Sequence, residues 1–318
     1  MQTTASLNSG TGSVATKPAA FYDKLLLEVL RQKQFVHEKL AQKRDMPART
    51  GDTVQFRRIT KLEPKLTPLT EGVTPDSSTG GVTAISVSTK QYGDFMEFTD
   101  VVDFQMVDPI ITEYVKEQGH QAAETLDIVM REVLNAGSNV FYAAGKTSRA
   151  ALAAGDKFSI KDVRAIVRNF KKNHVRPALN GNYVCMISPD TEFDLYDDAE
   201  FRAMMEIGNN NKPLIDGEIS RMYNTVFMTT VNAKVFAGAG AGTPAVDVQS
   251  ALVIGANAYG VTRISGQGSV KSIIKGLGSA GTLDPLNQRQ TIGWKVNAFA
   301  GVILEQLALV RYEHVASK

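Results

Sequence analysis

The chain has 318 residues, of which 43% are hydrophobic and 21% charged, which is typical of a folded globular protein and excludes a disordered chain. Its 35 basic and 33 acidic residues leave a net charge of +2, which argues against a protein that binds nucleic acid through a large positive field. The single cysteine, Cys185, excludes an internal disulfide and a cysteine-rich metal site.

The N-terminal part predicts an arm followed by a helix. Residues 1–18 are rich in Ser, Thr and Gly, so we expect a flexible arm, and they lack the basic start and apolar centre of a signal peptide. Apolar residues recur with a helical period from Phe21 to Arg44. The basic end of this helix favours a simple interaction with the helix dipole, and contact with an acidic neighbour or nucleic acid is the alternative.

The stretch 53–102 predicts a long β-hairpin. TVQFRRI and VTAISVSTKQYGDFMEFTDVV alternate polar with apolar or β-branched residues, and three prolines and Gly80-Gly81 separate them. Arms of about 20 residues would span roughly 65 Å, which exceeds the width of a compact body of this size. Because a two-stranded ribbon is marginally stable alone, we expect a second copy of the chain to cover it.

Charged residues along this hairpin are the candidate contacts between subunits. The candidates are Arg57, Arg58, Lys61, Glu63, Lys65 and Glu71. Their mixed charge suits the polar contacts of a subunit interface. A solvated edge that discourages unwanted strand pairing explains them equally well, and both interpretations stay open.

Residues 108–137, DPIITEYVKEQGHQAAETLDIVMREVLNAG, predict one long helix. Asp108 suits the N-cap, Pro109 the first turn and Gly137 the C-terminal stop. Apolar residues at steps of three and four form one stripe: Ile111, Val115, Ala122, Leu126, Val129 and Val133. A helix of this length spans roughly 40 Å and therefore crosses most of the molecule.

Two further expectations concern this helix. Asp127 and Arg131 are spaced for an i,i+4 ion pair on its outer side. Gly119 is its weak point, costing about 1 kcal/mol in helix propensity relative to Ala, and is a candidate hinge.

The remaining chain alternates helices and strands. SIKDVRAIVRNFKKNH predicts a helix capped by Ser159, with an apolar face and a basic face that is either solvated or in contact with DNA. NYVCMIS predicts a buried strand, and Pro189 begins a short helix. This alternation over 156–275 indicates an α/β or α+β subdomain, and the apolar segment 291–315 predicts a strand that packs on the long helix.

Motifs that suggest catalysis are weak. Gly145-Lys146-Thr147 lacks the first glycine of a phosphate-binding loop, and the glycines at 276, 278 and 281 precede no helix. An acidic cluster lacks calcium-loop spacing: Asp194, Asp197, Asp198 and Glu200. Cys185 is interpreted as buried packing, and the four histidines are dispersed. We expect no enzyme, cofactor or metal.

Five stretches, in this order, resemble the Hong Kong 97-type major capsid proteins of tailed phages, specifically the coliphage N-four-like group. They are TGDTVQFRRITKL with LTEGVTPD, the 108–137 helix, PLIDGEISRMYNTVFMTT, SALVIGANAYGVTRI and WKVNAFAGVILEQLALVRYEH. Together they cover about residues 21–314.

The resemblance implies an α+β fold in five parts. They are an N-terminal arm with a helix (1–50), an extended β-hairpin loop (51–107), a peripheral domain with the spine helix (108–155), an axial domain (156–286) and a C-terminal strand returning to the peripheral domain (287–318).

The resemblance also implies a function and partners. Copies would form hexamers and pentamers that tile an icosahedral head around double-stranded DNA, with weak non-specific DNA contacts, and would be assembled in the host cytoplasm. A portal protein is an expected partner, a decoration protein is an optional one, and a separate scaffolding protein or processing is expected because little sequence precedes Phe21. The alternatives are a nanocompartment shell and an α/β enzyme that uses the glycines at 276–281.

Overall fold

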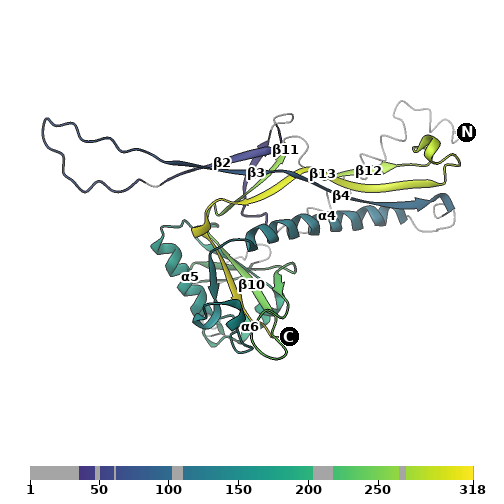
Figure 1. The fold of residues 1–318 in the computed structure, drawn as a ribbon. Helices are drawn as coiled ribbons and strands as arrows, with labels where there is room; N and C mark the ends of the chain where they lie inside the picture. The colour runs from purple at the N-terminus through teal and green to yellow at the C-terminus, as the bar shows by residue number, and fades with distance from the viewer. Residues whose placement is uncertain are drawn as a thin grey trace, which may run out of the picture.

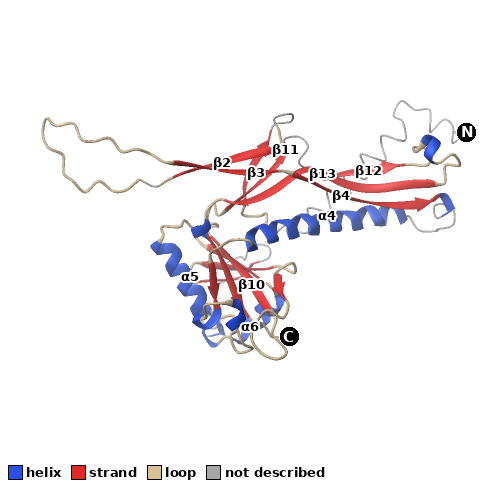
Figure 2. Cartoon of the chain, viewed as in Figure 1, coloured by secondary structure: helices blue, strands red, loops and turns tan. Residues whose placement is uncertain are grey.

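The computed structural model describes residues 36–46, 51–60, 62–101, 110–202, 218–264 and 270–317. The chain forms a long sheet that lies along one helix, a compact sheet flanked by helices, and a two-stranded hairpin that projects away from both (Figure 1). Strands make up most of the regular structure, and the long helix α4 (Ile110–Asn135) is the largest helical element (Figure 2).

Helix α4 confirms the predicted apolar stripe where its side chains are described, although Val129 and Val133 are only half-buried and the side chain of Ile111 lies outside the description. Val115, Ala122 and Leu126 are buried in the main core, together with Ala123, Met130 and Leu134. The helix ends at Asn135, and the N–H of Gly137 donates to the carbonyl of Leu134 at 3.3 Å. Gly137 ends the helix without a left-handed φ, and a Cβ there would lie 3.3 Å from the same carbonyl oxygen. The predicted caps at Asp108 and Pro109 lie outside the described residues.

The prediction of an Asp127–Arg131 ion pair was wrong. Asp127 is only 4% exposed and bonds to His37, while the Arg131 guanidinium pairs with Glu132. The spacing was correct for a surface pair, but Asp127 lies on a side of α4 that other parts of the chain cover.

The long sheet has the strand order β1-β11-β13-β12, and β4 also pairs with β13. Its strands are β1 (Gln42–Met46), β4 (Lys90–Thr99), β11 (Tyr259–Ile264), β12 (Lys271–Lys275) and β13 (Arg289–Ile303). Strand β13 packs on α4, where Gln118 Nε2 donates to the Ile292 carbonyl at 2.7 Å and Trp294 Nε1 donates to Gln121 Oε1 at 2.9 Å. The prediction that the last apolar segment packs on the long helix is confirmed.

Gly301 of β13 packs closely against Met130 of α4, and we expect G301V to destabilise the fold. A Cβ at this position would meet the thioether of the fully buried Met130. Overpacking of this kind costs about 1–3 kcal/mol, measurable as a lower urea midpoint. G276V is the matched control, since a Cβ at Gly276 meets no atom within 4 Å. Equal midpoints for the two variants would contradict this packing.

The compact sheet has the order β5-β14-β10-β6-β8-β7, with β9 paired to β10. Its strands are β5 (Val140–Tyr142), β6 (Tyr183–Ile187), β7 (Glu218–Met222), β8 (Thr225–Thr229), β9 (Lys234–Phe236), β10 (Val248–Ile254) and β14 (Leu309–His314). Helices α5 (Ile160–Lys172) and α6 (Pro189–Asp197) flank it (Figure 1). The predicted cap is confirmed, because Ser159 Oγ accepts from the Asp162 N–H at 3.2 Å.

His314, in the core of this compact part, should make stability depend on pH. Burial lowers the pKa of His314 to about 4, from 6.5. Below pH 6.5 the unfolded chain gains a proton, and the folded chain does so only near pH 4. The neutral His314 ring therefore makes its full contribution to the free energy of unfolding above pH 6.5. This contribution declines by about 3 kcal/mol as the pH falls through 4. We expect urea midpoints to drop between pH 7 and pH 4.5.

The control variants for this pH dependence are H314Q and H174Q. The side chain of His314 is completely buried, whereas His174 is exposed. H314Q should flatten the loss of stability between pH 7 and pH 4.5, and H174Q should leave it unchanged. An unaltered pH dependence in H314Q would contradict the assignment.

The predicted N-terminal helix is wrong at its C-terminal end. Residues 36–40 form turns, and Gln42–Met46 form strand β1, which pairs in parallel with β11. The tertiary pairing prevails over a helical period, and Lys43 and Arg44 therefore lie on a strand rather than at a helix end. Residues 21–35 of this prediction lie outside the described residues.

The strands within the stretch 53–102 belong to two different sheets. Strand β2 (Thr53–Ile59) pairs antiparallel with β3 (Val82–Ser88), as the hairpin prediction required. After Thr89 the chain leaves the hairpin, and β4 pairs with β13 instead. Tyr92 and Phe98 of β4 pack against the main core, so the second half of the stretch is covered within its own chain.

Candidate assembly surfaces

The loop of the hairpin has no cover within the described chain. Every described residue of 62–81 is exposed, including three leucines, of which Leu66 is 87% and Leu69 77% exposed. Ile59, at the end of β2, is 78% exposed. A run of exposed large apolar side chains on a projecting segment is typical of a surface that binds another protein.

The base of the hairpin is fixed to the body. Val54 and Phe56 of β2 are buried with Met46 and Leu304 in a small separate core. Arg58 Nη1 lies 2.8 Å from Glu305 Oε2. The hairpin therefore leaves the body in a defined direction.

The far end of the loop is a tight turn. The Val73 N–H donates to the Thr70 carbonyl at 3.2 Å, and Gly72 has a φ of +77°, which a glycine adopts without strain. Glu71 occupies the other central position of this turn, between the exposed Leu69 and Val73. The prolines at 64, 68 and 75 stiffen the two arms that carry the turn.

The predicted contact residues lie on this hairpin in different settings. Arg57, Glu63, Lys65 and Glu71 are exposed, whereas Arg58 is engaged by Glu305 of its own chain. Lys61 lies outside the described residues. The hairpin thus presents most of these side chains to solvent, and their role between subunits stays a prediction.

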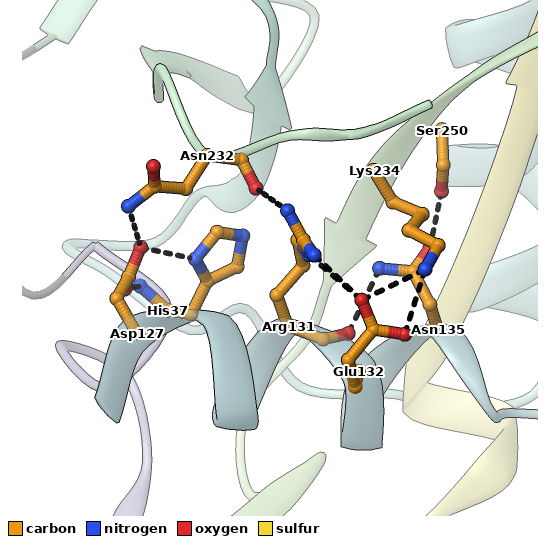
Figure 3. A network of polar contacts seen from close by, with 8 residues as sticks. All are labelled: His37, Asp127, Arg131, Glu132, Asn135, Asn232, Lys234 and Ser250. Carbon is orange, nitrogen blue, oxygen red and sulfur yellow. Dashed lines mark hydrogen bonds and ion pairs between the residues drawn. The ribbon is translucent and has the colours of Figure 1, made fainter. Parts of the chain in front are cut away.

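A polar network along α4 joins segments that are distant in sequence (Figure 3). Asp127 Oδ1 accepts from the His37 N–H at 3.1 Å, its Oδ2 lies 3.0 Å from His37 Nδ1, and Asn232 Nδ2 donates to Oδ2 at 3.1 Å. Burial raises the pKa of Asp127, but the hydrogen bonds and charge of His37, with Asn232, hold it below its ordinary value. Sequence reasoning missed this cluster, because its members are 90 and 105 residues apart.

The network continues towards the end of α4. Arg131 donates to the Asn232 carbonyl at 3.2 Å, Glu132 pairs with Lys234 at 2.8 Å, and Ser250 Oγ donates to Asn135 Oδ1 at 2.6 Å (Figure 3). These contacts come from β9, β10 and the loop before β9. One helix therefore holds both the N-terminal segment and the compact sheet in position.

The side chains that suggested catalysis have structural partners. Each acidic side chain of the 194–200 cluster is bonded: Asp194 to Lys157 and Ser317, Asp197 to Arg202, Asp198 to three backbone N–H groups, and Glu200 to Arg164 and Tyr223. Cys185 is buried, and burial raises the pKa of its thiol. Among the described residues no group of three metal-ligating side chains occurs, and the glycines at 276–281 lie in a turn and a short 3₁₀ segment.

A profile of the phage capsid protein family matches residues 82–312, well over half of the chain. The chain belongs to the phage capsid protein family. This confirms the predicted function as the major capsid protein of an icosahedral phage head, a structural protein of the virion and not an enzyme. The enzyme alternative, with the glycine loop at 276–281, is excluded.

Solved capsid structures confirm the fold class of this capsid protein. The capsid of Ralstonia phage GP4 is 17% identical, with a TM-score of 0.72 over 90% of this chain and 89% of that one. The capsid of cyanophage Pam1 is 16% identical, with a TM-score of 0.66 over 87% and 88%. The predicted α+β fold of Hong Kong 97-type capsids is therefore confirmed.

Two other comparisons are negative. No curated protein is similar enough in sequence to the capsid protein to count as a relative. Within the described ranges, no helix has both the length and the hydropathy to cross a bilayer.

Proposed function

We propose that the protein self-assembles as hexamers and pentamers into a shell of the Hong Kong 97 type around double-stranded DNA, in the manner of the coliphage N-four-like group. The observation that carries the proposal is the hairpin loop at 62–81, whose apolar side chains are exposed throughout. Burial of one such leucine side chain contributes about 1.5–3 kcal/mol, so a neighbouring copy that covers several gains a substantial contact.

Contacts between subunits are assigned to the hairpin. Arg57, Glu63, Lys65 and Glu71 are exposed on it and available to a neighbour, and Lys61 and Arg58 complete the proposed set. Many modest contacts per copy let misplaced subunits dissociate, whereas a closed lattice is held by their sum.

The domains of the subunit are proposed to follow the five ranges inferred from sequence: 1–50, 51–107, 108–155, 156–286 and 287–318. Maturation of the shell would proceed by rotation of these parts as rigid units, with α4 bending near Gly119. Helix α4 runs unbroken through the buried Gly119, which supplies a flexible position between two well-packed halves.

The proposed partners of the shell are a portal protein and a separate scaffolding protein, with a decoration protein as an optional addition. Packaged DNA would make weak, non-specific contacts, consistent with a net charge of +2. Assembly is placed in the host cytoplasm.

Negative-stain microscopy of the purified chain, with and without the co-expressed scaffold, tests the proposal. Closed shells of phage-head dimensions are the expected result. Small shells filled with protein cargo would indicate the nanocompartment alternative. Discrete compact monomers at every concentration, scaffold included, would contradict the proposal.

A further inference from the structure

A groove lies between the base of the hairpin and the compact sheet. It has a volume of about 700 Å³, and its walls come from β2 and β3, the segment that follows α5, the turn after β10 and the segment before β14. Arg57, Ile59, Arg176 and Leu307 are among its lining residues. The groove therefore lies where the projecting hairpin meets the body.

The lining of this groove combines positive charge with exposed apolar surface. The lining includes three arginines and one carboxylate, Glu305, which pairs with Arg58, and Arg57 and Arg176 have no ion-pair partner among the described residues. Ile59 is 78% and Leu307 50% exposed. Such a lining suits a segment that carries carboxylates beside aliphatic side chains.

The end of the hairpin loop has this chemistry. Residues 66–81 contain Glu71 and Asp76 but no lysine or arginine. Glu71 occupies the tight turn, and the exposed Leu69 and Val73 flank it. The turn thus presents one carboxylate between two apolar side chains.

Resting on the proposed function, we propose that the 69–76 turn of one copy docks into the arginine groove of the next copy. Glu71 pairs with Arg57 and Arg176, and Leu69 and Val73 cover Ile59 and Leu307. The contact is head-to-tail, because the turn and the groove are different surfaces of the same chain. Repeated around an axis, a head-to-tail contact closes into rings such as hexamers and pentamers.

The reach of the hairpin fits a neighbour and not its own groove. Twelve extended residues from Ile59 to Glu71 span roughly 40 Å, which is about twice the radius of gyration of roughly 20 Å expected for a compact body of this length. The three prolines keep the arms extended, so the turn does not fold back onto its own base. The exposed Ile59 and Leu307 favour a protein segment over the phosphates of a nucleic acid.

Crosslinking of two engineered cysteines tests the docking. The single native thiol, Cys185, is completely buried, so a short bifunctional maleimide should react selectively with E71C and R176C in the full chain. Particles that carry both changes should give, on a denaturing gel, a ladder that extends to five and six chains. The control pair E71C with K161C, in which Lys161 is exposed on α5, should give no ladder. Particles that form normally without a ladder would overturn the docking.

A charge exchange distinguishes direct pairing from general disruption. E71R and R176E should each lower particle yield about tenfold, and the chain with both changes should recover part of it, because the introduced arginine and glutamate again attract each other while Arg57 remains positive. If the chain with both changes yields no more particles than the single variant with the lower yield, the docking is wrong.

Two outcomes distinguish this docking from polyanion binding and from a general failure of assembly. If R57E and R176E leave particle yield unchanged and lower only the DNA content, the groove binds a polyanion and the docking is wrong. If the wild-type chain forms no particles even with scaffold, the proposed function fails before the docking is reached.

Discussion

A chain that lacks residues 62–80 should fold normally and form no particles. Every described residue of the deleted segment is exposed, and none belongs to a hydrophobic core. The Thr60 N–H already bonds to the Gly81 carbonyl at 2.9 Å, so the deletion leaves β2 and β3 joined by a short hairpin loop. We expect an unchanged circular dichroism spectrum and urea midpoint, with particle yield reduced to background in sedimentation.

A loop of equal length is the matched control. Replacing 62–80 by a Gly/Ser sequence of the same length keeps the chain connected and removes the leucines, the prolines and the charges. This variant should also fail to form particles, because the loop's side chains and stiffness are lost. Normal particles from either chain would refute the assignment of the hairpin as the main contact between subunits.

The second large effect is expected from D127A, which should reduce the free energy of unfolding by about 3–5 kcal/mol. Asp127 is 4% exposed and accepts hydrogen bonds from His37 and Asn232. Without its carboxylate the buried His37 and the half-buried Asn232 lose their acceptor, and the N-terminal segment loses its attachment to α4. A lower urea midpoint at pH 7 and faster proteolysis within residues 36–46 are the expected readouts.

A double-mutant cycle tests whether the loss of the Asp127–His37 contact causes the destabilisation. D127A combined with H37A should cost at least about 1 kcal/mol less than the sum of the two single variants, because both remove the same pair. E124A is the control on the same helix, since Glu124 is exposed and its loss should change stability by less than about 0.5 kcal/mol. Strict additivity, or an equal effect of E124A, would contradict the network.

The pH dependence of the Asp127 contribution follows from the same contacts. The pKa of Asp127 in the folded chain lies below its ordinary value of 3.8. Its stabilisation is therefore complete above pH 3.8 and is lost as the pH falls through the lower folded value. It follows that the loss expected between pH 7 and pH 4.5 comes from His314 and not from Asp127.

Local patterns were reliable wherever a period or a cap decided the structure. The stripe of α4 and the Ser159 cap of α5 were predicted correctly, because a residue three or four positions away specifies each of them. Residues 42–44 were mispredicted as helix, since the strand conformation of β1 depends on pairing with β11, more than 200 residues later. The same limit explains the Asp127 error, because the residue that binds Asp127 lies 90 positions away.

The same contrast between nearby and distant residues applies to the candidate assembly surfaces. The sequence alone indicated a projecting β-hairpin with charged arms, and β2 and β3 form it. It did not indicate where the hairpin ends, because β4 alternates like β3, and only the packing of Tyr92 and Phe98 against the core shows that β4 belongs to the long sheet. The arginine groove was equally hidden, since Arg57 and Arg176 line the same groove only in the folded chain.

By itself, the sequence determined the long helix, the alternating strands, the projecting ribbon and the order of parts that resembles a capsid protein. Each of these follows from residues close together in the chain, or from the linear order of such segments. The tertiary structure decided which strands pair, where the ribbon ends, and which charged side chains are buried on α4 or line the groove. Those features depend on contacts between residues far apart in the chain, and no local period encodes such a contact.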